Sequence, residues 1–121
     1  MLYWAQSKTH IYLDAKFSHM AADSEPCLKL DDLKIDFESE RLKLAGICNM
    51  HGKKVKYLLN IPLNGPIQPS ESSYLVLTGH AEITLAKAQV GQVWKDVSDR
   101  KQGVVEKWWR KQRLIDTFAE L

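Results

Sequence analysis

Residues 1–17 read MLYWAQSKTHIYLDAKF, and this stretch decides the fold class. Its second half alternates between apolar and polar side chains, which is the period of an extended strand with one buried face. Apolar residues are interleaved with polar ones from Gln6 onward, unlike the unbroken apolar core of a secretory signal. We therefore expect the N-terminus to be part of the fold. The predicted buried face consists of Ile11, Leu13, Ala15 and Phe17, and the opposite face carries His10, Asp14 and Lys16.

The same alternation recurs along most of the chain, with polar turns between the runs. Strands are expected around residues 28–30, 33–37, 42–44, 55–63, 75–77 and 81–85, with surface loops at 18–25 and 64–73. Helical periodicity begins only after Ser98, where one face would combine Val105, Trp108, Trp109, Gln112 and Ile115. Short strands without intervening helices predict an all-β protein, an antiparallel β-sandwich of seven to eight strands with a short helical or irregular C-terminal segment.

Length and composition indicate one globular domain. The chain has 121 residues, of which 45% are hydrophobic and 26% charged, within the range of folded domains. No run approaches the roughly 20 apolar residues that a membrane helix needs. We expect residues 1–97 to form the sandwich and residues 98–121 to form an extension that packs on it or projects from it.

The two cysteines, Cys27 and Cys48, form no C-x-x-C pair. Free cysteine is among the most buried residue types, and without a recognisable signal segment a reducing compartment is the simpler assumption. The sequence therefore predicts two buried free thiols and a cytoplasmic protein, with the nucleus as a second location.

Catalytic and metal-binding motifs are missing from the sequence. The four histidines stand at no ligand spacing, and there is no G-x-S-x-G, H-E-x-x-H or glycine-rich phosphate loop. Paired carboxylates occur at Asp31–Asp32 and Glu38/Glu40, where turn and surface positions favour a solubilising role. We expect no enzyme activity, no cofactor and no metal, and we interpret the histidines as surface or turn residues.

Charge is unevenly distributed, although the net charge is only +2. Residues 95–113 hold seven basic and three acidic residues, interleaved with Trp108 and Trp109 and preceded by Trp94. Aromatic and basic residues together are typical of binding surfaces. The alternative is that the tryptophans seal one end of the sandwich while the cations keep the segment soluble.

Three features, taken in order, resemble the CS-domain family. Trp4-Ala5-Gln6 leads directly into the alternating strand, short strands of a sandwich follow, and the last strand is followed by ITLAKAQVGQVWKDVS, residues 83–98. The family's W-P-R-L-T-K-like stretch is matched through Lys87, Trp94 and Lys101, with Lys95–Asp96 where the family has Pro-Arg. The acidic tail of the co-chaperones in this family is absent from the sequence.

This resemblance implies a non-enzymatic, monomeric co-chaperone domain that docks on the ATP-bound N-terminal region of heat shock protein 90. It would modulate the ATPase cycle and the release of client proteins, with no contact to nucleic acid or membrane. The family arrangement implies that the binding residues lie beside the start of the first strand. They are Trp4, Gln6, Lys8, Lys87, Trp94, Lys95, Lys101 and Trp108.

Other readings stay open at this point. The resemblance also fits a CS-type adaptor of the nuclear-movement class, or the recognition domain of a larger membrane 3-hydroxyacyl-CoA dehydratase. A weaker alternative is a glutathione-dependent prostaglandin E synthase using Tyr3 or Tyr12. A phenol needs a pKa well below about 10 for that role, and the sequence places no cation obviously beside either tyrosine.

Overall fold

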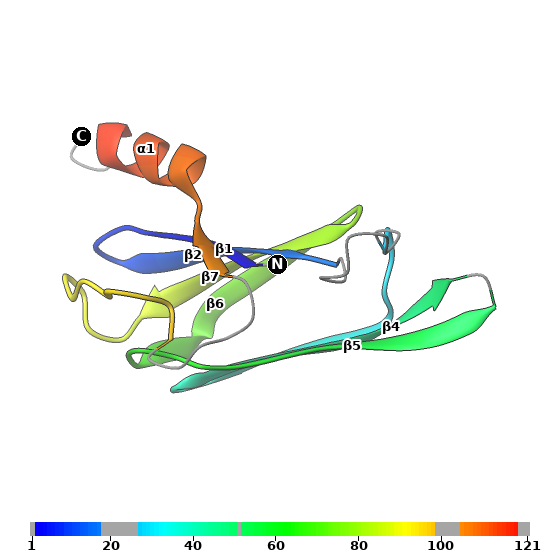
Figure 1. Cartoon of the computed structure of the whole chain (residues 1–121). Helices are drawn as coiled ribbons and strands as arrows, with labels where there is room; N and C mark the ends of the chain where they lie inside the picture. Colours follow the sequence, from blue (N-terminus) through cyan, green and yellow to red (C-terminus); the bar gives the residue numbers. More distant parts are fainter. Residues whose placement is uncertain (1, 18–26, 51, 99–104, 119–121) are drawn as a thin grey trace.

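The computed structural model describes residues 2–17, 27–50, 52–98 and 105–118. These residues form two packed sheets and one helix, so the predicted β-sandwich is confirmed, and the C-terminal segment expected to be helical or irregular contains a short helix. The helix α1 (Trp109–Phe118) lies on the outer side of the larger sheet, away from β4 and β5 (Figure 1). The larger sheet has the order β6 (Ile67–Leu77), β7 (His80–Lys87), β2 (His10–Lys16), β1 (Leu2–Gln6), β8 (Val105–Lys107). The smaller sheet has the order β3 (Asp31–Glu38), β4 (Arg41–Met50), β5 (Lys53–Pro62).

The core lies where the alternating faces of β2 and β7 meet the smaller sheet. Leu13 pairs with Ile83 in the antiparallel register, and both side chains are buried together with the other apolar residues of their faces. Because strand side chains alternate, the pairing of one residue sets the inward face of the whole strand. The predicted buried face of β2 is therefore confirmed at all four positions, Ile11, Leu13, Ala15 and Phe17.

One polar residue on the opposite face of β2 is buried as well. The Asp14 carboxylate accepts a hydrogen bond from His80 Nδ1 at 2.7 Å and lies 3.2 Å from Lys16 Nζ. His80 follows the Gly79 turn and sits opposite Lys16 on the neighbouring strand. This histidine is a partly exposed residue beside the turn, as expected, and it also has a carboxylate partner that the sequence did not indicate.

Two expected elements differ in the structure. Residues 28–30 are not a strand: Leu28 is exposed, Leu30 is buried, and β3 begins at Asp31. The expected loop at 64–73 is also wrong, because β6 already begins at Ile67. Ile67 is buried and pairs with Lys87, and a shift in register between Gln68 and Ser73 absorbs the proline and serines that suggested a loop.

The C-terminal segment divides into a strand and a helix. Val105 belongs to β8, which pairs in parallel with β1, so the expected helical face containing Val105 is wrong. The free edge of β1 offers backbone groups to this segment, and Trp108 N–H donates to Trp4 O at 2.6 Å. A short strand on that edge gives backbone groups of β1 a hydrogen-bonding partner, which an extra helical turn would not supply.

Cys27 and Cys48 are joined by a disulfide, with their Cα atoms 6.1 Å apart. The predicted burial of both residues is confirmed, and the prediction of free thiols is wrong. Cys27 precedes the smaller sheet and Cys48 lies on β4, so only the packing of distant segments brings the two sulfurs together. The residues next to each cysteine in the sequence do not indicate that the two cysteines come into contact.

Candidate protein-binding site

Lys87, the last residue of β7, is the centre of the site although only 3% of it is exposed. Its ammonium group donates hydrogen bonds to Gln6 Oε1, Ser7 O and Gln92 O, all within 3.0 Å. Three acceptors match the three protons of a lysine side chain. The residue therefore ties the end of β7 to the turn after β1 and to the loop that follows β7.

Burial lowers the pKa of Lys87 below its ordinary 10.5, because removal of water disfavours the charged form. The folded chain thus releases this proton before the unfolded chain does. In the pH interval just below 10.5 the unfolded state binds more protons, and the contribution of Lys87 to stability rises with pH.

We predict that Lys87→Met lowers the free energy of unfolding by about 2 kcal/mol, because Ser7 O and Gln92 O lose a buried donor. Urea denaturation measures this loss, and the difference from the unsubstituted protein should grow as the pH rises toward 10.5. Lys8→Met removes an exposed lysine nearby and should change stability by less than about 0.5 kcal/mol. Equal effects of the two substitutions would contradict the central role of Lys87.

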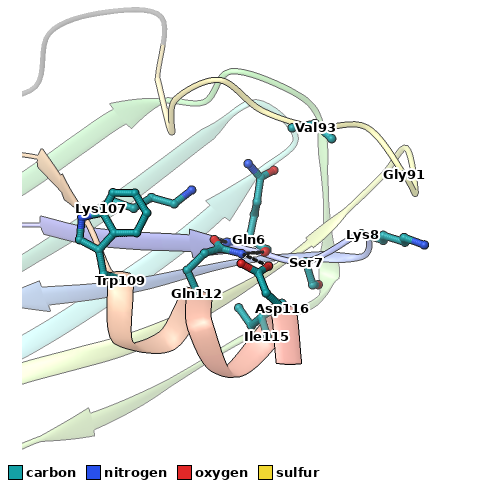
Figure 2. Close-up of a pocket in the computed structure, with 10 residues that line it drawn as sticks. All are labelled: Gln6, Ser7, Lys8, Gly91, Val93, Lys107, Trp109, Gln112, Ile115 and Asp116. Atoms are coloured by element: carbon teal, nitrogen blue, oxygen red, sulfur yellow. Dashed lines mark hydrogen bonds between the residues drawn. The ribbon is translucent and has the colours of Figure 1, made fainter. Parts of the chain in front are cut away.

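Gln6 joins three segments through both its side chain and its backbone. Its amide group accepts from Trp94 N–H and donates to Trp94 O, at 3.0 and 2.7 Å. Its backbone makes a reciprocal pair with the Gln112 side chain, at 2.9 and 2.8 Å (Figure 2). Gln6 therefore sets the position of α1 and of the loop 91–94 relative to β1.

Trp94, the last residue of that loop, has a buried side chain, with 3% of its surface exposed. A Cβ at Gly65 would lie 2.8 Å from Trp94 Nε1, so only glycine allows this close approach. Within the described residues, Trp94 Nε1 is a buried donor without a hydrogen-bond partner. The apolar body of the indole, rather than its N–H group, supplies the stabilisation.

Cations lie over aromatic rings where the C-terminal segment, formed by β8 and α1, contacts β1 and β2. Lys107 Nζ is 4.1 Å from the centre of the Trp4 ring, and Lys111 Nζ is 4.8 Å from that of Tyr12. Burial lowers the pKa of Lys107, and the charges of Asp116 and Asp96 partly oppose this shift. Such cation–π contacts hold the C-terminal segment against β1 and β2.

A groove of about 590 Å³ opens between α1 and the loop after β7 (Figure 2). Trp109 and Val93 line it and are 71% and 78% exposed, while Lys8, Lys107 and Asp116 supply its charges. Large apolar side chains this exposed, beside positive charge, are typical of protein-binding surfaces. We name this feature the α1 groove. Its lining residues are Gln6, Ser7, Lys8, Gly91, Val93, Lys107, Trp109, Gln112, Ile115 and Asp116.

The residues predicted for binding divide into three groups. The structure brings Trp4, Gln6, Lys87, Trp94 and Trp108 together, but Trp4, Lys87 and Trp94 lie in the interior and support the groove from below. Lys8 lines the α1 groove, Lys95 is exposed, and Lys101 lies outside the described residues. Their role in binding stays a prediction.

Sequence reasoning missed the contributions of Val93 and Lys107 to this site. Val93 neighbours the matched Trp94 but belongs to no alternating run, and Lys107 is not among the residues of the helical face expected after Ser98. Gln112 was expected on the packed face of the helix, and the structure places it against Gln6. Because Trp109 and Gln112 have a fixed spacing on one helix, that spacing could have indicated that both residues belong to the same site.

Other kinds of site find little support in the described part of the chain. Residues 2–17, 27–50, 52–98 and 105–118 contain no cluster of three or more His, Cys, Asp or Glu side chains suited to a metal ion. No helix among them is long and apolar enough to cross a membrane. Contrary to expectation, a cation does lie beside Tyr12, but Lys111 contacts the ring face.

Comparison with known proteins identifies the family. The model of the CS domain matches residues 2–87. A search of curated protein sequences gave no match.

Solved structures share the fold at low sequence identity. Heat shock protein 16.0 from Schizosaccharomyces pombe has a TM-score of 0.61 at 14% identity, covering 83% of this chain and 96% of its own. The CS domain of human KIAA1068 protein has a TM-score of 0.61 at 13% identity, with coverages of 84% and 74%. A nuclear movement protein from E. cuniculi has a TM-score of 0.52 at 11% identity, with coverages of 80% and 96%. At these identities the similarity establishes the fold.

Proposed function

Because the chain belongs to the CS-domain family, whose members mediate protein–protein interactions, we propose that it is a co-chaperone domain for heat shock protein 90. It docks on the ATP-bound N-terminal region of that chaperone and modulates its ATPase cycle and client release. CS domains are generally non-enzymatic, and we propose the same for this chain. We further propose that it acts as a monomer, whereas the cytoplasmic location expected from free thiols loses that premise with the Cys27–Cys48 disulfide.

The α1 groove is the observation that supports this function. Aromatic side chains at the centre of an interface are common hot spots, and Trp109 is an exposed aromatic side chain in the lining of this groove. Lys8 and Lys107 line the same groove, and exposed Lys95 follows buried Trp94. A partner that offers an apolar side chain to Trp109 and carboxylates to these lysines would complement the surface.

We predict that Trp109→Ala weakens binding to heat shock protein 90 by about 10-fold or more, because a central apolar contact is lost. Calorimetric titration with and without a non-hydrolysable ATP analogue measures this effect. Leu114→Ala is the control, since Leu114 is an exposed residue of α1 that does not line the groove. Lys95→Glu with Lys101→Glu should weaken binding in a manner that added salt reduces.

Two outcomes would contradict this proposal. One is no nucleotide-dependent binding at tens of micromolar, although even a modest interface reaches roughly micromolar affinity. The other is binding that Trp109→Ala and Leu114→Ala weaken equally. If the double charge reversal binds as tightly as the parent at low salt, Lys95 and Lys101 do not form part of the docking surface.

The second candidate is an adaptor of the nuclear-movement class, favoured by the structural similarity to the E. cuniculi nuclear movement protein. The two candidates differ in nucleotide dependence. Binding that requires the ATP analogue is expected of the chaperone-docking domain, and binding that the analogue does not affect would favour the adaptor. The same titration therefore distinguishes them.

A further inference from the structure

The opposite end of the larger sheet carries an apolar edge that the proposed function does not use. β6 is the edge strand there, four strands away from β8 and the α1 groove. Its last four residues, Tyr74, Leu75, Val76 and Leu77, are all exposed. Leu75 pairs with Glu82 and Tyr74 with Ile83, so the apolar side chains occupy both faces of the edge.

Natural sheets usually protect such an edge with charged residues, proline or a covering segment. Residues 74–77 contain no charge and no proline, and the proline of β6 lies in its first half. In the described part of the chain, β7 is the only strand hydrogen-bonded to β6. Within residues 2–17, 27–50, 52–98 and 105–118, one row of backbone donors and acceptors along residues 74–77 therefore has no strand partner.

The core is also incompletely closed beside this edge. β3 lies next to β6, and the Phe37 and Tyr74 rings are 6.3 Å apart. The core-facing residues of β3, namely Leu33, Ile35 and Phe37, are only half-buried, whereas those of β2 and β7 are almost fully buried. Apolar surface on β3 is thus available to side chains of a strand added to β6.

The charge around this edge differs from that of the whole chain. β3 and β6 together contain five acidic residues and one lysine, although the chain as a whole has a net charge of +2. Asp36 and Glu38 flank Phe37, with Glu38 ion-paired to Lys43 Nζ at 3.1 Å, and Glu82 lies opposite Leu75. The edge therefore offers an apolar strip bordered by negative charge.

We propose that the 74–77 edge of β6 binds an extended polypeptide segment in which apolar residues alternate with basic ones. The segment adds a strand to β6 through backbone hydrogen bonds, as in β-augmentation. Its apolar side chains contact Tyr74, Leu75, Val76 and Leu77, and its basic side chains lie near the carboxylates of β3 and β7. Exposed, basic-apolar stretches of an incompletely folded protein have this chemistry. This second binding activity is independent of the α1 groove.

A labelled (Lys-Leu)₄ peptide tests the proposal by fluorescence anisotropy against the full chain. We expect it to bind at least 10-fold more tightly than (Glu-Leu)₄, because like charges repel the acidic peptide. Leu75→Thr with Leu77→Thr should weaken binding at least 10-fold, whereas Leu58→Thr, an exposed leucine on the β5 edge, should not. Threonine suits strands, so these exposed substitutions should leave the melting temperature nearly unchanged.

Amide hydrogen exchange measured by NMR tests for backbone hydrogen bonding between the peptide and β6. Non-specific hydrophobic contact would not change this exchange. Bound peptide should slow exchange at residues 74–77. Unchanged exchange there, equal binding of the acidic peptide, or equal losses in the β6 and β5 variants would each overturn the proposal. Loss of peptide binding in Trp109→Ala would place the site in the α1 groove instead. Concentration-dependent dimerisation that the β6 variant abolishes would identify a second copy of the chain as the occupant and overturn the proposed partner.

Discussion

Trp94→Ala should lower the free energy of unfolding by about 3 to 5 kcal/mol, the range for replacing a buried large aromatic residue with alanine. Trp94 is almost fully buried and is in contact distance of Gly65, so its loss leaves a cavity that the glycine turn cannot fill. Urea denaturation followed by circular dichroism measures the change. We also expect binding to heat shock protein 90 to weaken about 10-fold, because Trp94 positions the loop that carries Val93.

Trp94→Phe is the matched control for this experiment. Phenylalanine retains most of the apolar volume and removes the buried N–H group that has no partner in the described structure, so we expect a loss of only about 1 to 2 kcal/mol. A loss below about 1 kcal/mol for Trp94→Ala would show that the indole is not a core residue. Weakened binding without lowered stability would instead identify Trp94 as a direct contact residue.

Removal of the disulfide with Cys27→Ala and Cys48→Ala should cost about 3 kcal/mol of unfolding free energy. The bond joins residues separated by 21 positions, and closing a loop of this size restricts the unfolded chain. Urea denaturation under oxidising conditions measures the effect. It is the second largest change that we expect among the variants considered for stability.

Reduction of the unsubstituted protein provides the control. The reduced protein should unfold at nearly the same urea concentration as the double alanine variant, and reductant should not affect that variant. Rapid alkylation of both cysteines in the native oxidised protein would show that the bond does not form. Equal stability of the unsubstituted protein with and without reductant would also show that the bond does not form.

Local periodicity was sufficient to predict most strands and the buried faces of β2 and β7. Ile83 and Leu85 are buried as the alternation requires, and Gly79 adopts positive φ at the predicted turn. The sequence pattern gave the wrong prediction where residue composition suggested a loop but the chain forms a paired strand. The proline and serines of residues 64–73 favoured a loop, yet β7 pairs with both ends of β6, and a shift in register between Gln68 and Ser73 accommodates the residues between them.

The candidate site could be predicted only in part. Trp4, Gln6, Lys87 and Trp94 were singled out, and the structure does bring them together. The sequence could not show which of them are exposed, because burial depends on the segments that cover them. Lys87 illustrates this point, since a lysine at a strand end is ordinarily solvated and here has three backbone and side-chain acceptors around it.

By itself, the sequence determined the sandwich, because the period of two in apolar residues is a local property that selects a strand and its inner face. The family also followed from short motifs near the two ends of the matched region. Tertiary structure alone decided the Cys27–Cys48 bond, the parallel pairing of β8 with β1, and the position of Trp109 in the lining of the α1 groove. Each of these depends on contacts between residues far apart in the chain. No local pattern encodes such contacts, because they arise only when the two sheets and the helix pack together.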